Sequence, residues 1–343
     1  MKQWIGYQRG VNLGGWFSQC DYSTDRYEHF ITKEDIADLA TWGIDHVRLP
    51  VDYNLVEEEQ GGYREEGFAY IQRVLDWCGE YGLHMILDLH KTAGYSFDAG
   101  EQEDGFFSSS EYQERFYRLW EEFARRYGQY KDRLAFELLN EVTDQSYYEA
   151  WNRISGICIE RIRALVPDID ILVGGYWNNN VRAVKDLPMP QDNHIIYNFH
   201  CYDPLIFTHQ GADWVAEMAP DFRFAYDQSY RKYYDTLDAV FGDAFGEIPK
   251  VDNMDRNFNS DFFRKIFAEA VQVAEERDVA LYCGEYGVID VVEPEDTLKW
   301  YQAIHTVFEE FGIGRAAWTY RDMNFGLSGE HYQDVLEQIK ENL

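Results

Sequence analysis

The chain has few cysteines, no long apolar run and few basic residues relative to acidic ones. Its five cysteines form no CxxC pair, so we expect buried free thiols and neither a disulfide framework nor a zinc cluster. No run of 18 apolar residues occurs, which predicts a protein without a membrane span. Basic residues number 31 against 62 acidic ones, and the formal net charge is -31. Because a phosphate backbone needs a basic surface, nucleic acid is not an expected partner.

The chain also lacks signals for targeting and for a second domain. Residues 1–6 have no apolar core of the kind found in signal peptides. We therefore expect either a cytoplasmic protein or a secreted one whose signal peptide is absent from this sequence. No linker rich in Gly, Ser or Pro interrupts residues 1–343, which predicts a single domain. We also expect a monomer.

Aromatic residues are abundant, with 26 Tyr, 22 Phe and 10 Trp among 343 residues. Most of these rings are expected in the core and on helix faces. An aromatic face can also stack on the C–H face of a sugar, so the richness is compatible with a carbohydrate-binding cleft. A neutral polysaccharide would not be repelled by the negative charge of the protein.

Apolar runs of strand length alternate with amphipathic segments of helical period along the whole chain. The expected strands are residues 10–14, 44–49, 83–89, 134–140, 171–175, 194–199, 280–284 and 314–319. The expected helices include residues 33–42, 67–81, 111–127, 147–165, 261–277 and 295–311. This α/β alternation indicates a parallel sheet, and eight repeats predict a closed (β/α)8 TIM barrel with its active site at the carboxyl ends of the strands.

One connection is too long for a plain barrel. About 80 residues separate the sixth expected strand from the seventh, and one helix with short loops needs far fewer. Residues 203–260 are therefore predicted to form an insertion between strand 6 and helix 6. The sequence leaves open whether this insertion contacts substrate.

Polar side chains stand at or just beyond the ends of six expected strands. Two of them are glutamates that follow apolar runs, Glu141 after residues 134–139 and Glu285 after residues 280–284. A carboxyl group at the end of a buried strand has no packing reason to be there, and two such groups can serve as acid and nucleophile on either side of a glycosidic bond. The other polar side chains at these strand ends are Arg48, His90, Asn140, His200, Tyr202 and Trp318.

Three motifs in this order resemble glycoside hydrolase family 5, the cellulase family. They are Gly10-Val11-Asn12-Leu13-Gly14-Gly15-Trp16, Leu139-Asn140-Glu141 and Gly284-Glu285-Tyr286-Gly287. The stretch from Asn198 to Pro204 is most similar to the clostridial endoglucanase C type within that family, which also carries a long insertion after the sixth strand. Cys201 departs from the pattern, because an aromatic residue is common at that position. The resemblance covers essentially the whole chain.

The resemblance implies roles for these residues. Glu141 is expected to be the general acid/base and Glu285 the nucleophile of a retaining reaction, with carboxyl groups about 5–5.5 Å apart. Arg48 and Tyr202 are expected to contact Glu285 and hold it ionised. Six further side chains are assigned to substrate: Asn140 to the sugar 2-OH, His90 and His200 to hydroxyls or to Glu141, Trp318 to the floor at the cleavage point, and Trp16 and Trp177 to sugar-stacking platforms.

The expected activity is that of an endo-β-1,4-glucanase acting on cellulosic, mixed-linkage or glucomannan chains, without metal or other cofactor. Within the family, an exo-β-1,3-glucosidase and a β-mannanase remain alternatives. A metal-dependent barrel hydrolase using His90, His200, Glu141 and Glu285 is a remote alternative, because no HxH or HExxH pair is present. A non-catalytic sugar-binding protein would be indicated by loss of one glutamate, and both are present.

Overall fold

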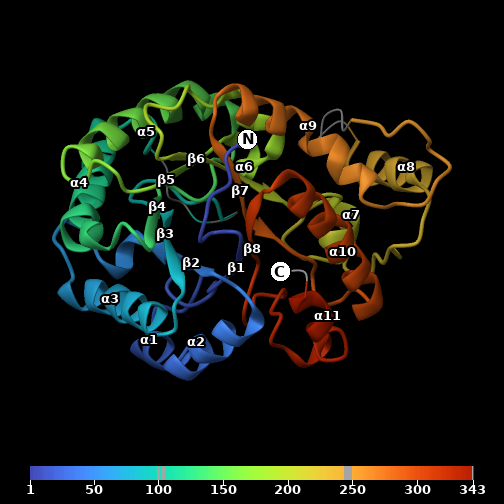
Figure 1. Ribbon diagram of the computed structural model, residues 1–343, viewed down its shortest axis with the longest axis horizontal. Coiled ribbons are helices and arrows are strands. Elements are labelled where there is room, and N and C mark those ends of the chain that lie inside the picture. The colour runs from blue at the N-terminus through green and yellow to red at the C-terminus, as the bar shows by residue number, and fades with distance from the viewer. Residues whose placement is uncertain (99–100, 102–104, 243–248, 342) are drawn as a thin grey trace.

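Eight parallel strands form a closed barrel in the computed structural model, which describes residues 1–98, 101, 105–242, 249–341 and 343 (Figure 1). The strands pair in chain order and β1 pairs with β8, which confirms the predicted (β/α)8 fold. They are β1 Arg9–Asn12, β2 His46–Asp52, β3 His84–Lys91, β4 Leu134–Glu137, β5 Ile171–Gly174, β6 Ile195–Cys201, β7 Ala280–Tyr286 and β8 Gly314–Ala317.

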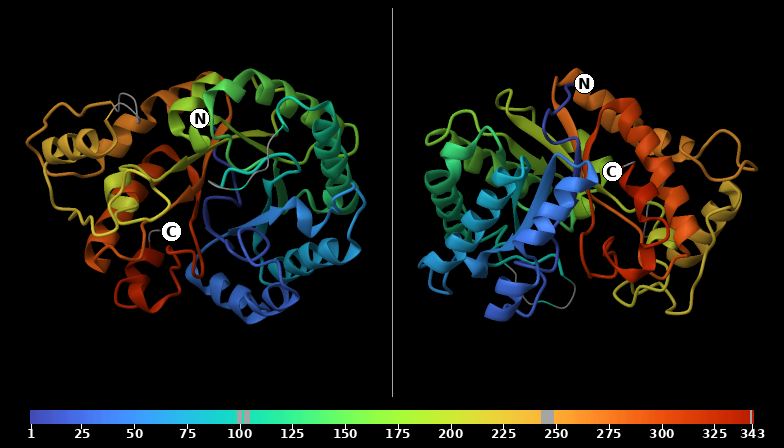
Figure 2. Two further views of the ribbon diagram at one scale, coloured as in Figure 1. Left: turned by 180° about the vertical axis from the view of Figure 1, so that it is seen from behind. Right: turned by 60° about the horizontal axis from the view of Figure 1, so that its bottom comes forward.

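The helices lie outside this ring, as both views of Figure 2 show. They are α1 Thr24–His29, α2 Lys33–Leu39, α3 Glu65–Glu80, α4 Ser110–Tyr127, α5 Tyr148–Arg163, α6 Tyr176–Asn179, α7 Leu205–Thr208, α8 Tyr230–Phe241, α9 Asp261–Glu276, α10 Pro294–Phe311 and α11 Leu336–Lys340. Among the helices that the structure describes, none has the length and apolarity that a bilayer crossing requires.

Local sequence signals fix the helix ends. Thr32 and Asp35 form a reciprocal capping box at the start of α2, which supplies partners for backbone N–H groups that have none inside the helix. Gly43 and Gly312 each follow a helical segment with φ of 78° and 67°, a left-handed conformation that glycine adopts without a Cβ penalty. The helix that was expected over residues 33–42 divides into α2 and a 3-10 turn at Ala40–Trp42.

Two layers of different polarity fill the barrel interior. The amino-terminal end holds an apolar cluster that includes Trp4 and Tyr7, whose rings stack at 3.9 Å. Above it lies a polar layer in which Arg48 of β2 is in register with Asn12 of β1, and Asp88 of β3 with Glu137 of β4. All four polar side chains are buried, so this layer forms the base on which the side chains at the strand ends rest.

The predicted insertion follows β6 and contains α7 and α8. In Figure 1 and in the left view of Figure 2, α8 lies at the margin of the molecule, outside the ring of barrel helices. It packs through its own aromatic cluster, in which Tyr233 stacks on Phe258 at 4.4 Å and meets Phe224 edge-on at 4.7 Å. Tyr226 Nα–H donates to Asp296 of α10, which ties the insertion to the barrel.

Candidate active site

A cavity of about 950 Å³ opens at the carboxyl ends of the strands, where parallel barrels place their sites. Six of the eight predicted site residues line it, and they come from β3, β6, β7 and the segments that follow β4, β6 and β8: His90, Glu141, His200, Tyr202, Glu285 and Trp318. The other two, Arg48 and Asn140, lie below its floor with 0% and 1% exposure.

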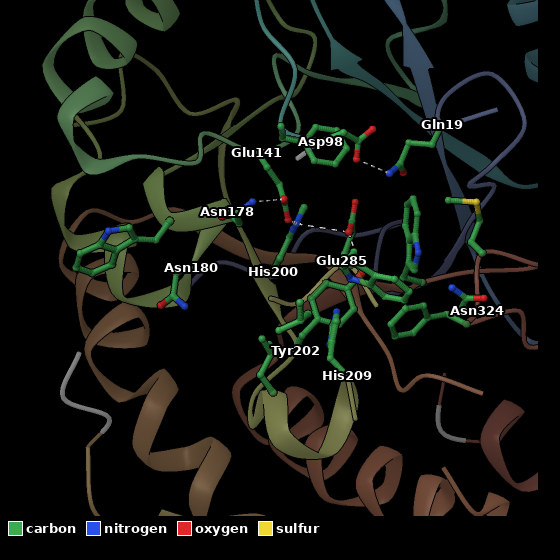
Figure 3. Close-up of a pocket in the computed structure, with 18 of the residues that line it drawn as sticks. Gln19, Asp98, Glu141, Asn178, Asn180, His200, Tyr202, His209, Glu285 and Asn324 are labelled. Atoms are coloured by element: carbon green, nitrogen blue, oxygen red, sulfur yellow. Dashed lines mark hydrogen bonds and ion pairs between the residues drawn. The ribbon is translucent and has the colours of Figure 1, made fainter. Parts of the chain in front are cut away.

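Glu141 and Glu285 face each other across this cavity (Figure 3). One carboxylate oxygen of each, together with a ring nitrogen of His200, lies within a span of 4.8 Å. Their exposed fractions are 9% and 5%. The two carboxyl groups are therefore close neighbours inside the cavity.

Glu285 sits at the end of β7 and is held from two sides. Arg48 Nη1–H donates to Glu285 Oε1 at 2.8 Å, and the Tyr202 hydroxyl donates to Oε2 at 2.9 Å. Both contacts were expected from the sequence. Because Arg48 is buried, it acts on the site through Glu285 and has no surface facing the cavity.

Arg48 also binds two further carboxylates in the polar layer. Its Nε and Nη2 atoms donate to both oxygens of Glu137 at 2.7 and 2.8 Å, and Nη2 lies 3.0 Å from Asp88. Nη2 donates in addition to Asn140 Oδ1 at 2.8 Å. That contact fixes the amide of Asn140 with its oxygen toward the barrel, so a contact of Asn140 with the sugar 2-OH would use Nδ2 and stays a prediction.

Glu141 lies four residues beyond the end of β4, in a different environment. Its Oε1 is 2.8 Å from His200 Nδ1, and its Oε2 accepts a hydrogen bond of 2.7 Å from Asn178 Nδ2. Burial raises the pKa of the Glu141 carboxyl above its ordinary value, while the hydrogen bond from Asn178 acts in the opposite direction. Burial also lowers the pKa of His200 to about 4, so the imidazole beside Glu141 is neutral at neutral pH.

His90 forms one wall of the cavity and is fixed by Asp88. His90 Nδ1 lies 2.5 Å from Asp88 Oδ2, and burial lowers the pKa of His90 to about 3. The indole of Trp318 lies parallel to the imidazole, with ring centroids 5.8 Å apart and an angle of 2°. These two flat groups line the cavity beside the carboxyl pair.

Sequence reasoning missed several residues of the site and misplaced one. Asp88 was given no role, although it lies two positions before His90 on β3, so that both side chains point the same way. Asn178 and Trp214 were not assigned, and both line the cavity. Trp16 was wrong as a platform, because it has 0% exposure and stacks on Phe17 at 4.2 Å. Trp177, by contrast, is 42% exposed and lines the cavity.

The insertion forms part of the cavity wall, which the sequence had left open. Leu205, His209, Trp214 and Phe241 all line the cavity, and Trp214 is 46% exposed. His209 meets Tyr202 edge-on at 5.0 Å, so the insertion also packs against the side chain that holds Glu285. The insertion is therefore placed to influence which substrates enter.

Glu141, His200 and Glu285 also have the spacing of a possible metal site. In the described part of the chain, each of the three already has a protein partner: Asn178 for Glu141, Arg48 for Glu285, and Glu141 for His200. A divalent ion would have to displace these contacts, so the arrangement fits a carboxyl pair with its supports better than a preformed metal site.

The family model, two related sequences and a solved structure to which this chain is similar all belong to one kind of protein. The model of the family described as Cellulase (glycosyl hydrolase family 5) matches residues 9–324. Cellodextrinase A of Ruminococcus flavefaciens is 48% identical over 310 residues, which cover 90% of this chain and 84% of that protein. Endoglucanase C of Acetivibrio thermocellus is 34% identical over 342 residues, covering 98% and 97%. A crystal structure of an endoglucanase from Thermotoga maritima shares the fold, with a TM-score of 0.74, 22% identity and 97% coverage of both chains.

Proposed function

The chain belongs to the cellulase family, glycosyl hydrolase family 5, and from that premise we propose that it is a retaining endo-β-1,4-glucanase acting by double displacement. As a member of this family it is a glycoside hydrolase of endoglucanase type that acts on glucans. The single observation that carries the stereochemical proposal is the distance within 4.8 Å between the oxygens of Glu141 and Glu285.

In the first step Glu285 attacks the anomeric carbon while Glu141 protonates the departing glycosidic oxygen. The bond from carbon to that oxygen breaks, and an ester bond between the sugar and Glu285 forms. Arg48 and Tyr202 support this role, because a cation and a hydroxyl donor each bind one oxygen of the attacking carboxylate and orient it. The raised pKa of Glu141 supports the acid role, since only the protonated carboxyl can donate.

In the second step Glu141, now ionised, takes a proton from water, and the water oxygen attacks the same carbon. The ester bond to Glu285 breaks and the configuration of the anomeric carbon is restored. His200 adjoins both carboxyls, with Nδ1 at 2.8 Å from Glu141 and 3.7 Å from Glu285. A neutral imidazole there can donate a hydrogen bond to Glu141. It adds no charge that would oppose the loss and gain of the Glu141 proton between the two steps.

Trp318 and His90 are proposed to hold the sugar at the cleavage point, and Asn140 to bind its 2-OH. Trp177 and Trp214 are exposed at 42% and 46% and line the same cavity, so both are available to stack on further sugar units. Two exposed indoles in addition to Trp318 favour a chain of several glucose units over a single terminal sugar.

The proposed substrates are soluble β-1,4-containing glucans, among them cellodextrins, mixed-linkage glucan and glucomannan. The similarity to a cellodextrinase over 90% of the chain supports short soluble chains. A β-mannanase activity is the second candidate, because the Thermotoga maritima enzyme of the same fold has been crystallised with mannotriose as well as with cellobiose.

The decisive experiment is product analysis on barley mixed-linkage glucan, carboxymethyl cellulose, glucomannan, mannan and laminarin, with Glu285→Gln as the control. Internal cuts in the β-1,4-glucans that vanish in Glu285→Gln are expected. Glucose released from chain ends alone, or a preference for laminarin or mannan, would refute the endoglucanase assignment. Near-wild-type rates in Glu285→Gln would refute the nucleophile assignment.

A further inference from the structure

The backbone after β5 makes a left-handed turn at three residues that are not glycine, which costs conformational free energy. Trp177, Asn178 and Asn179 have φ angles of 53°, 55° and 55°, and none of them is glycine. A left-handed conformation costs an L-residue about 1–2 kcal/mol, with Asn among the residues that tolerate it best. Such strain is retained where the surrounding structure uses the resulting side-chain directions.

The turn is bound to the segment that carries Glu141 by three hydrogen bonds. Asn178 N–H donates to the Val142 carbonyl at 3.0 Å, and Asn178 Nδ2 donates to Glu141 Oε2 at 2.7 Å. Asn179 Nδ2 donates to the Asn140 carbonyl at 2.5 Å. The residues on both sides of Glu141 and its own side chain are thus fixed by one turn.

The preceding glycine makes room for this arrangement. A Cβ atom at Gly174 would lie 1.9 Å from Asn179 Oδ1, inside the space that the amide occupies. Glycines at positions 178 and 179 would form the same turn with less strain. The chain instead has asparagine at both positions, and each amide is used on the segment from Asn140 to Val142.

We propose that Asn178 is a positioning residue that sets the proton affinity of Glu141, so that this carboxyl can act as acid in one step and as base in the next. This inference rests on the proposed acid/base role of Glu141. An amide N–H can only donate, so it stabilises the ionised oxygen that it faces and disfavours a proton there. Without this donor, the raising effect of burial on the pKa of Glu141 loses one of the contacts that oppose it, so the proton is held more tightly when the second step begins.

Other groups around Glu141 act in both directions and do not replace the amide. The His200 imidazole is neutral, Glu285 is a second carboxyl, and Asp98 raises the pKa of Glu141 while Arg48 lowers it. In Figure 3 Asn178 lies beside Glu141 on the side away from Glu285. Substrate between the two carboxyls therefore leaves the contact between Asn178 and Glu141 in place.

The test is the pH dependence of kcat/KM on phenyl β-cellobioside, whose poor leaving group needs the acid. Asn178→Gly keeps the left-handed backbone and removes the donor, so the alkaline limb should move to higher pH by about one unit. Asn178→Asp places a carboxylate beside Glu141 and should move that limb further in the same direction. Asn324→Gly is the matched control, because Asn324 lines the same cavity with a φ of 61°. Its alkaline limb should stay at the wild-type pH.

A second readout uses 2,4-dinitrophenyl β-cellobioside, for which breakdown of the ester is expected to limit kcat. A more strongly held proton leaves less ionised Glu141, so kcat of Asn178→Gly should fall most at acid pH. A structural role alone would lower activity without moving either profile. Alkaline limbs at the wild-type pH in both Asn178 variants would overturn the proposal.

Glu141→Ala, measured on phenyl β-cellobioside, separates the two hypotheses. Loss of the alkaline limb in Glu141→Ala shows that Glu141 is the titrating acid, and unchanged limbs in the Asn178 variants would then refute only the role of Asn178. An alkaline limb that persists in Glu141→Ala would refute the acid/base assignment and the role of Asn178 with it.

Discussion

Replacing Arg48 with methionine should cost the protein a large part of its stability. The guanidinium is fully buried and contacts the carboxylates of Glu137, Asp88 and Glu285 at 2.7–3.0 Å. Removing one partner of a buried ion pair costs about 3–5 kcal/mol, because an uncompensated charge stays behind. A single domain has a total stability of about 5–15 kcal/mol, so the loss expected in Arg48→Met lies between about a fifth of it and all of it.

The loss should depend on pH. Without the cation, the carboxyls can remain buried only by keeping their protons, so their pKa values in the folded state should rise above those of the unfolded chain. The folded state of Arg48→Met is then least penalised below the unfolded pKa values, near pH 4, and is increasingly destabilised as the pH rises. Asp88 already behaves in this way in the wild type, since burial raises its pKa to about 7 in spite of Arg48.

Urea unfolding at pH 5 and pH 8 measures both effects. At a slope of about 3 kcal/mol per molar urea, the midpoint of Arg48→Met should fall by about 1–2 M, and by more at pH 8 than at pH 5. Arg126→Met is the matched control, since Arg126 binds Glu65 through two hydrogen bonds of 2.7 Å at the surface, where such a pair is worth about 0–1 kcal/mol. An Arg48→Met midpoint equal to that of the control at either pH would refute the reasoning. Arg48→Lys should retain more stability, because it keeps the charge while losing the planar donor fork.

Four further predictions concern the reaction. Glu141→Ala should lose about 10²–10⁴ in kcat/KM on phenyl β-cellobioside but far less in kcat/KM on 2,4-dinitrophenyl β-cellobioside, whose leaving group needs little acid help. Equal losses on both substrates would contradict an acid role. Proton NMR of the first products should show the β-anomer, whereas an initial α-anomer would mean inversion. EDTA should leave activity unchanged, and a loss that divalent ions restore would favour the metal-dependent alternative. Trp214→Ala should raise KM for mixed-linkage glucan more than for phenyl β-cellobioside, because Trp214 lies on the insertion wall of the cavity; equal effects on both would place this side chain outside the substrate path.

The barrel could be predicted from the sequence because its strands are buried on both faces. Such strands appear as continuous apolar runs, and all eight were located to within a few residues. Glu141 and Glu285, whose carboxyls meet in the cavity, could be singled out for the same reason, since a carboxyl group after a buried strand contrasts with its surroundings. The expected strand over residues 134–140 is too long, because β4 ends at Glu137 and the following residues curve into the mouth of the barrel.

The supporting residues of the site were harder to predict. Asp88 lies two positions before His90, so both side chains point to the same face of the strand. Its role nevertheless depends on Arg48, which lies on the neighbouring strand 40 positions earlier. Asn178 lies in irregular backbone, where no period indicates the direction of a side chain. The local signal is a run of three asparagines at residues 178–180, because asparagine tolerates left-handed backbone. Trp16 failed as a platform because its place after β1 does not reveal on which side it packs, and the ring lies against Phe17 and Trp77.

The neighbours of the two glutamates account for their different proposed roles. Glu285 faces a permanent cation and a phenolic donor, so its negative charge is paired before any substrate arrives. Glu141 faces a neutral imidazole and an amide in a buried position, where a charge is only partly supported and a proton is more easily kept. Arg48 cannot donate hydrogen bonds to both glutamates of the pair. Its remaining donors are bound to Glu137, Asp88 and the two asparagines at positions 12 and 140. The polar layer inside the barrel thus directs the cation to one carboxyl of the pair, and that asymmetry makes one glutamate suited to attack and the other to proton transfer.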